Sequence, residues 1–414
     1  MRGIHPVAKP AHVPDAAVCE FDMFKDAELL RDPHERVRDL LNRAPNGLLW
    51  TPHNGGHWAA IGHATVFTVS RDPETFSSSP ADATGMARFA ALEEKIGRHI
   101  PQQRPITLDP PAHGKYRGPL QATFSPKSAV SKREEIRALA DSLIAAVKDQ
   151  GQCDFITSIA EPLPVQVFLK MMGLPLDRQA QFRHLVHEFL APRGSAPEEQ
   201  VRRQLMVADA MLDVIKAREH DPKDDIISLL WRTQIDGKPM TIEVMQDYCT
   251  LLFIAGLDTV INGIGFGIRH LAQDHSLQEQ LRANPSAIPE AAEELLRRYT
   301  FTVPMRRIAK DTELAGYPLK KDEWIAVYLP GADLDSKEFP QPEKFDLQRE
   351  NKVHIAFGAG PHRCLGAHLA RVELQVLYAQ VLAKLPTFRL DADKPVKFHG
   401  GNIIAIDSLP IRWD

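Results

Sequence analysis

Residues 354–371 read HIAFGAGPHRCLGAHLAR and place Cys364 between a glycine-rich loop and a regular helix. Apolar residues recur at helical spacing from Leu365 onward, and Pro386 ends the pattern. The cysteine is therefore expected at a helix N-terminus. Because the unpaired N–H groups there favour an anion, the sequence predicts a thiol with a lowered pKa.

The residues around this cysteine form an ordered pattern. A lone cysteine is most often a small buried apolar residue, and that is the alternative to a chemical role. Here, however, every fixed position of the pattern F-G-x-G-x-H/R-x-C-x-G is filled, by Phe357, Gly358, Gly360, His362, Cys364 and Gly366. The pattern resembles the haem-binding loop of the cytochrome P-450 superfamily, the haem-thiolate monooxygenases.

This resemblance implies a fold and a cofactor. The expected fold is mainly α with a smaller β-rich region (α+β), with one long central helix crossing the haem. Haem b would take an axial thiolate from Cys364, which pushes electron density onto the iron and favours O–O cleavage. Phe357, Gly358 and Gly366 would shape the loop beside the cofactor.

Composition predicts one domain over residues 1–414, with residues 1–20 as an extended segment, because no linker, repeat or low-complexity tract divides the chain. The four cysteines lie far apart, which indicates neither a disulfide framework nor a zinc site. The net charge of −4 gives no pull toward nucleic acid. The N-terminus lacks the apolar region of a signal peptide or anchor. We therefore expect a soluble, cytoplasmic monomer of the bacterial branch without a membrane anchor.

The most apolar run, residues 251–268, could cross a bilayer by length alone. Asp258 and Asn262 would then lie in lipid without partners. A central helix from Thr241 to about Ala272, buried on nearly all sides, is the preferred interpretation.

The sequence Ala255-Gly256-Leu257-Asp258-Thr259 resembles the superfamily's A/G-G-x-D/E-T motif, in the helix that passes the oxygen-binding face of the haem. We expect Thr259 to turn its hydroxyl away from the i−4 carbonyl and loosen the helix, and Asp258 to pass protons. The alternative is that Thr259 bonds back within the helix and that Asp258 forms a structural salt bridge.

The haem propionates need basic partners if they are buried. His113 and Arg117 stand at i and i+4 in DPPAHGKYRGPL, which resembles the D-P-P-x-H-x-x-x-R stretch of bacterial members. His362 and Arg306 match the other propionate positions. Arg307 competes with Arg306, and the sequence leaves that choice open.

Glu294 and Arg297 resemble the superfamily's E-x-x-R pair, which locks the core behind the haem. The usual third member is an arginine in a P-x-R-F turn, where this chain has Lys344. Lysine cannot reproduce the bidentate geometry of arginine, so the third member stays open.

The resemblance is strongest to the camphor-hydroxylating branch. It implies an apolar pocket over the iron, lined by Leu251, Ile254, Ala255, Thr302, Val303 and Ile403. Residues 82–108 lack the tyrosine that holds the camphor ketone, and Pro304 replaces an aspartate that helps to cap a propionate. We therefore expect a less polar or bulkier terpenoid or norisoprenoid. The apolar side of a mobile lid is expected from Met86, Phe89, Leu92 and Ile96, and His99 or Gln102 is expected to offer a polar contact.

The function implied is monooxygenation with O2 and two electrons. No dinucleotide fingerprint or flavin domain is present, so the family implies a separate [2Fe–2S] ferredoxin and an NAD(P)H-dependent reductase. An acidic partner could dock on Lys115, Lys127, Lys352, Arg363 and Arg371. The rival functions are an H2O2-using peroxygenase, disfavoured by the pair Asp258 and Thr259, and a haem-based sensor or hydrophobic-ligand carrier without turnover.

Overall fold

The computed structural model describes residues 6–44, 46–190 and 197–414. The helices are α1 (Ala27–Arg31), α2 (Pro33–Asn42), α3 (His63–Arg71), α4 (Ala83–Ile96), α5 (Ala112–Arg117), α6 (Pro126–Ser131), α7 (Arg133–Val147), α8 (Pro162–Met172), α9 (Gln179–Leu190), α10 (Pro197–His220), α11 (Ile226–Trp231), α12 (Ile242–Gly256), α13 (Thr259–Gln273), α14 (His275–Ala283), α15 (Ile288–Arg298), α16 (Leu329–Asp333) and α17 (Ala367–Lys384). The strands are β1 (Leu48–Thr51), β2 (His57–Ala60), β3 (Phe76–Ser77), β4 (Gln152–Asp154), β5 (Gln234–Ile235), β6 (Lys238–Pro239), β7 (Met305–Ile308), β8 (Thr312–Leu314), β9 (Tyr317–Leu319), β10 (Trp324–Val327), β11 (Phe388–Leu390), β12 (Lys397–His399), β13 (Ala405–Ser408) and β14 (Pro410–Trp413).

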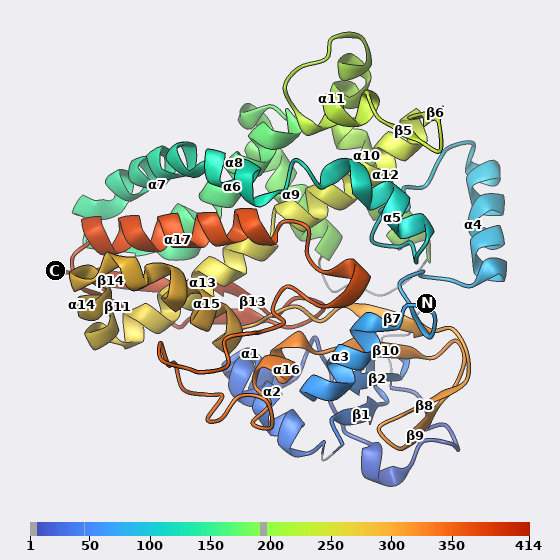
Figure 1. Ribbon diagram of the computed structural model, residues 1–414, viewed down its shortest axis with the longest axis horizontal. Coiled ribbons are helices and arrows are strands. Elements are labelled where there is room, and N and C mark those ends of the chain that lie inside the picture. The colour runs from blue at the N-terminus through green and yellow to red at the C-terminus, as the bar shows by residue number, and fades with distance from the viewer. Residues whose placement is uncertain (1–5, 45, 191–196) are drawn as a thin grey trace.

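The architecture is mainly helical with a smaller β region, as the sequence predicts (Figure 1). The largest sheet has the strand order β1-β2-β10-β7-β3 and lies at the lower right of Figure 1, beside α2, α3 and α16. Its strands pair in antiparallel fashion except that β10 runs parallel to β2. A second sheet, β11-β14-β4, brings the C-terminal strand against a strand far earlier in the chain.

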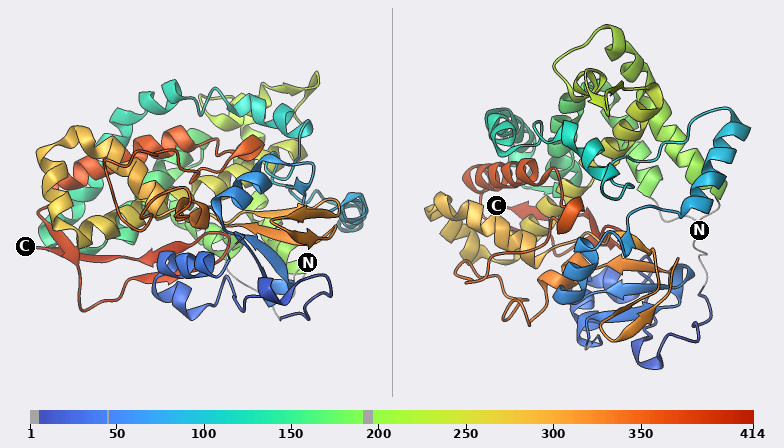
Figure 2. Two further views of the ribbon diagram at one scale, coloured as in Figure 1. Left: turned by 60° about the horizontal axis from the view of Figure 1, so that its bottom comes forward. Right: turned by 45° about the vertical axis from the view of Figure 1, so that its right-hand side comes forward.

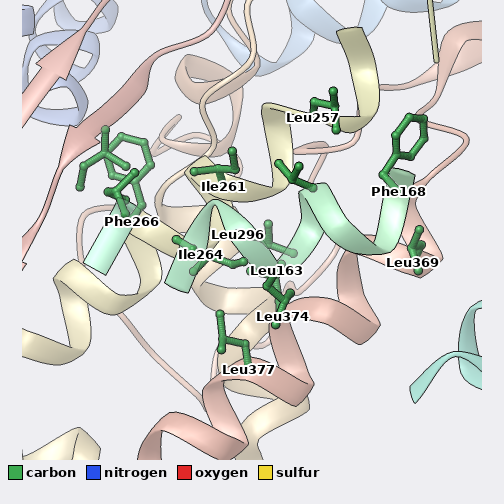
Figure 3. Packing of buried hydrophobic residues seen from close by; sticks show 14 of the residues in the cluster. Leu163, Phe168, Leu257, Ile261, Ile264, Phe266, Leu296, Leu369, Leu374 and Leu377 are labelled. Carbon is green, nitrogen blue, oxygen red and sulfur yellow. The ribbon is translucent and has the colours of Figure 1, made fainter. Parts of the chain in front are cut away.

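Two hydrophobic clusters hold these regions together. The smaller one packs the faces of the large sheet around Trp50 and Trp58, which are almost fully buried. The larger one lies among the helices, with α13 buried against α15 and α17. Figure 3 shows Phe168 of α8 beside the centre of this cluster, near Leu257 and Leu369.

The predicted central helix exists, but it is interrupted. Thr241 caps its N-terminus by accepting from the Val244 N–H, as expected. α12 ends at Gly256, and α13 begins at Thr259; of the two residues between them, Leu257 keeps right-handed helical dihedrals, whereas Asp258, with φ −131° and ψ −39°, leaves the helical region. Taken together, α12 and α13 are long and apolar enough to cross a membrane, but 61% of the apolar window is buried inside the protein. The buried interpretation of this helix therefore agrees with the structure.

Just before the interruption, Gly256 lies in close contact with α8. A Cβ atom added to Gly256 would lie 2.5 Å from the ring of Phe168, so only glycine allows α8 to pack so tightly there. Gly256 therefore stands where the central helix and α8 approach each other most closely at the end of α12.

Candidate functional site

The loop before α17 holds Cys364 in a fixed position. The N–H of Cys364 donates to the carbonyl of Phe357 at 2.8 Å, which folds the loop back on itself. Gly360 has φ 69°, and a Cβ there would lie 2.3 Å from the Ser70 carbonyl oxygen of α3. This glycine thus lets the loop pass directly over α3.

The predicted pKa direction of Cys364 is wrong. The Cys364 side chain is accessible to solvent and lies three residues before α17, with many protein atoms around it. Desolvation raises the pKa of the thiol, although the Gly366 N–H and the charge of Arg117 act in the opposite direction. The helix terminus therefore does not make a free thiolate by itself, and ionisation of the thiol would need metal coordination.

Beneath the loop, Arg371 connects α17 to the neighbouring helix α15. Its guanidinium lies 4.5 Å from the ring centroid of Phe357 and pairs with Glu293 at 2.6 Å. His354 contacts the same carboxylate at 3.0 Å. Desolvation tends to raise the pKa of Glu293, but the bonds from His354 and Arg371 outweigh it and lower that pKa to about 2. Arg371 thus has a structural role at the loop, and its place on a docking surface stays a prediction.

Four predicted propionate partners from three segments gather near Cys364. The rings of His113 and His362 lie 4.2 Å apart, and Arg117 donates to the Arg363 carbonyl at 2.6 Å. Desolvation and the charge of Arg306 lower the pKa of His362 to about 3. Two imidazoles and two guanidinium groups therefore lie close together beside the Cys364 loop.

Arg306 and Arg307 point to opposite faces of the sheet, because side chains alternate along β7. Arg307 has a side chain that is 11% exposed, and it pairs with Asp322 at 2.8 Å. Arg306 points the other way, and desolvation lowers its pKa to about 10. Its guanidinium donates to the neighbouring Met305 carbonyl, and among the described residues no carboxylate forms an ion pair with it.

These residues fit a haem. A desolvated guanidinium without an ion pair, beside His113, Arg117 and His362, is a suitable setting for two carboxylates. Within residues 6–44, 46–190 and 197–414, no group of three or more His, Cys, Asp or Glu side chains could hold a metal ion. A metal at Cys364 would therefore have to bring its other ligands with it, as a porphyrin does.

Two neighbours of this cluster were missed by the sequence analysis. Ser78 lies with its Oγ 3.0 Å from Nε2 of His362, and its N–H donates to Asp109 at 2.8 Å. Asp109 also accepts from Ser77. The D-P-P stretch thus ties β3 to the site, a link between distant segments that no local pattern indicates.

The expected conformation of Thr259 is wrong. Its hydroxyl donates to the i−4 carbonyl of Ala255 at 3.2 Å instead of turning away. The helix is still loosened, because the interruption at Leu257 and Asp258 removes regular main-chain bonding. Thr259 and Asp258 are both partly accessible there.

Side chains satisfy the carbonyls that the interruption releases. Arg183 of α9 donates to the Leu257 carbonyl at 2.6 Å and pairs with Glu161 at 2.7 Å. Asn262 donates to the Asp258 carbonyl at 3.1 Å and accepts from the Ile406 N–H at 3.0 Å. Arg183 was not singled out from the sequence, since it acts across 74 residues of chain. The sequence named Asn262 only as a polar residue of the apolar run, and its bond to the Ile406 N–H was not foreseen.

The predicted pocket residues divide into two groups. Leu251, Ile254 and Ala255 lie on one side of α12 with partly or fully accessible side chains. Thr302 and Ile403 form an antiparallel bridge and are half-buried. Val303 differs, because it is 1% exposed and packs in the hydrophobic core. The structure therefore does not present Val303 to a ligand.

The lid prediction is partly corrected. Met86, Phe89 and Leu92 lie half-buried on one side of α4, whereas Ile96 is exposed. His99 does not offer a free polar group, because both of its ring nitrogens face carboxylates. The side-chain amide of Gln102 donates to Ile100 in its own loop.

The buried pair behind the site is completed by an arginine that the sequence analysis missed. Arg297 binds Glu294 through two bonds of 2.8 Å, and both side chains are almost fully buried. Arg349 binds the same carboxylate at 3.0 Å. Lys344 contributes only its carbonyl, which accepts from Arg349 at 2.9 Å. The third member is thus Arg349, five residues beyond the position that the pattern indicates.

The other basic residues near the loop differ in their availability. Lys115 pairs with Asp236 at 2.7 Å, and Lys352 lies 3.7 Å from Glu290. Lys127 and Arg363 are exposed, and no ion pair to another described residue involves either. The predicted docking surface therefore reduces to a smaller set than expected.

Comparison with known families gives one match. The family described as Cytochrome P450 matches residues 140–412. Among curated proteins, "Probable cytochrome P450 127A1" of Sinorhizobium fredii is 33% identical, covering 98% of this chain and 96% of that protein. "Steroid C26-monooxygenase" of Mycobacterium tuberculosis is 31% identical, covering 85% and 94%. "Cytochrome P450-terp" of a Pseudomonas species is 29% identical, covering 86% and 87%.

A solved structure agrees over nearly the whole chain. The crystal structure of CYP101J2 superposes with a TM-score of 0.86 and 32% identity, covering 99% of this chain and all of that one. The arrangement of helices and sheets is therefore shared from end to end.

Proposed function

Because the chain belongs to the cytochrome P450 family, we propose that it hydroxylates a small hydrophobic molecule of the terpenoid or norisoprenoid class. The chain is a monooxygenase, and its cofactor is haem held by a cysteine thiolate. The bound haem supplies the activation of O2 and the insertion of one oxygen atom into a C–H bond, the other atom leaving as water.

The residues proposed to hold the haem act in two ways. Cys364 gives the axial thiolate, and Gly358 and Gly366 leave room beside it. His113, Arg117, Arg306 and His362 bind the propionates. The observation that carries this assignment is the desolvated Arg306, which lies in the same cluster as His362 and forms no ion pair with a described carboxylate, although the charge of Asp109 acts on it from farther away.

The interrupted helix is proposed to manage protons. Thr259 keeps its hydroxyl beside the interruption of the helix, where it could donate a hydrogen bond once it leaves the Ala255 carbonyl. Asp258, next to it, can exchange a proton with water that reaches the gap. Arg183 binds the Leu257 carbonyl and Asn262 binds the Asp258 carbonyl. These bonds keep the backbone of the interruption in place during the proton transfers.

The substrate class rests on the chemistry of the pocket. Leu251, Ile254 and Ala255 offer apolar contact, and His99 is already bound by two carboxylates. A substrate with few polar groups suits such a lining. The relative named P450-terp favours a terpenoid, whereas the steroid monooxygenase relatives favour a larger substrate.

Two electrons are proposed to come from a [2Fe–2S] ferredoxin with its own NAD(P)H-dependent reductase, in the bacterial cytoplasm, with the chain acting as a monomer. Lys127 and Arg363 are the exposed cations proposed to meet an acidic partner. Lys115 can join them if Asp236 releases it.

The substrate class is tested by titrating the purified ferric protein with terpenoids, norisoprenoids, steroids and fatty acids. A ligand that displaces water from the iron shifts the Soret band from the low-spin to the high-spin position. We expect that shift with a terpenoid or norisoprenoid. If only steroids or fatty acids produce it, the proposed class is wrong.

A further inference from the structure

Helix α4 lies over one end of the molecule with little packing to hold it. None of its residues is buried, and the left view of Figure 2 shows it at the edge of the molecule, apart from the other helices. Its apolar side reaches only half-burial, through Met86, Phe89 and Leu92. Because so little apolar surface is removed from water, contacts beyond the helix must determine where it sits.

Those contacts lie in the segment that follows, residues 97–107, which we call the strap. Asp247 on α12 is their common partner, with a side chain only 1% exposed. It accepts from Nε2 of His99 at 2.9 Å and from the Gln102 N–H at 2.5 Å, and Arg104 lies 3.3 Å away. One buried carboxylate thus joins the strap to the helix that lines the pocket.

His99 connects the same carboxylate to α4 itself. Its Nδ1 lies 2.7 Å from Glu93 in the last turn of α4, while Nε2 faces Asp247. A neutral imidazole has one N–H and can donate to only one of these carboxylates. Donation to both requires the imidazolium form, so the complete bridge exists only when His99 is protonated.

The charges around His99 favour that form. Desolvation lowers the pKa of His99, but the hydrogen bonds and charges of Asp247 and Glu93 outweigh it, so the net pKa is raised above 6.5. Glu243 on α12 is a third acid whose field reaches the ring. Arg104 opposes them from the strap. Tyr248, whose pKa burial raises, stays neutral throughout this range.

We propose that protonated His99 is the positioning residue that fastens α4 to α12 through Asp247, and that its deprotonation loosens the lid over the pocket. The inference deepens the proposed function by giving entry to the pocket a pH-dependent control. It also goes beyond hydroxylation, because the link from His99 to Asp247 exists whether or not a substrate is bound.

The direction with pH follows from the raised pKa. The bridge is complete below pH 6.5, and His99 gives up one of its two bonds as the pH rises through the higher value in the folded protein. The main-chain bonds from Gln102 to Asp247 and from Ile100 to Glu93 do not depend on pH, so the lid is loosened and not detached. The lid should therefore be held in mildly acidic solution and loosened in alkaline solution. Arg98, which pairs with Asp209 on α10, gives a weaker and exposed link that does not involve His99.

Hydrogen exchange of the substrate-free holoenzyme tests this proposal. After correction for the intrinsic pH dependence of exchange, amides of residues 83–107 should exchange roughly tenfold faster on the alkaline side. His99→Gln should give fast exchange at every pH, whereas the control His220→Gln, an exposed histidine at the end of α10, should behave like wild type. Peptides of α12 serve as the folding reference.

Two outcomes would overturn the inference: equal exchange of residues 83–107 across the pH range in the wild type, or a His99→Gln variant that is indistinguishable from it. If His99→Gln does not fold, the wild-type pH profile decides. The measurement needs no substrate or turnover, so a wrong substrate class in the titration leaves its result unchanged.

Discussion

At the scale of single residues, the sequence locates the site but not its electrostatics. Cys364 and His362 are recognisable because they belong to one short pattern with fixed spacing. The pKa direction of Cys364 could not be predicted, because desolvation depends on elements that are distant in the sequence. For the same reason the choice between Arg306 and Arg307 needed the alternation of β7 against its neighbours.

Thr259→Ala tests the proton role at this scale. The variant should still consume NADH with its redox partners, but it should release several-fold more peroxide and less product, because the hydroxyl no longer donates in the gap. Product and peroxide are measured per NADH consumed. Thr68→Ala is the matched control, since Thr68 makes the same i−4 bond, to Ala64 at 2.8 Å, on exposed α3. Unchanged coupling in Thr259→Ala would remove Thr259 from the mechanism.

Arg306→Leu tests the propionate assignment. Losing a charge-assisted bond to a propionate costs about 1.5–3 kcal/mol, so haem should dissociate roughly ten- to a hundredfold faster. Transfer of haem to an apo-globin acceptor measures that rate. Arg307→Leu, which loses only the surface pair with Asp322, should keep the wild-type rate. Equal effects of both substitutions would show that Arg306 has no special place at the haem.

At the scale of elements, periodicity and capping residues predict the helices well, and side-chain contacts decide where they break. The N-cap Thr241 and the end of α17 before Pro386 follow from local sequence. The interruption after Gly256 does not, because the local pattern of apolar residues continues through it, and the carbonyl of Leu257 is bound by Arg183, a residue far away in the chain. The sequence analysis likewise missed Arg349, because the P-x-R-F pattern places its arginine at position 344, where this chain has a lysine.

Arg349→Ala tests the buried network of Glu294, Arg297 and Arg349. Removing one partner of a buried ion pair costs about 3–5 kcal/mol, and the lower figure is expected because Arg297 stays bound to Glu294. Urea unfolding of the haem-bound protein measures the loss. Lys344→Ala should leave the unfolding free energy unchanged, because Lys344 contributes only a main-chain carbonyl. A larger loss in Lys344→Ala than in Arg349→Ala would contradict this network.

At the scale of the whole molecule, the fold class follows from the sequence because two distant motifs agree. The loop at Cys364 and the helix at Asp258 lie about a hundred residues apart in the chain, yet both belong to one architecture. What could not be predicted is how the outer segments close over that architecture. α4 and the strap are positioned by Asp247, a residue that the sequence shows only as one more polar position in a helix.

The most direct test of the account is the spectrum of the reduced protein under carbon monoxide. A thiolate from Cys364 on the haem iron predicts the long-wavelength Soret band of the family, retained in Cys153→Ser and lost in Cys364→Ser. A correctly folded wild-type protein that shows the shorter-wavelength band of histidine or neutral-thiol ligation, or that binds no porphyrin, would contradict the central claim.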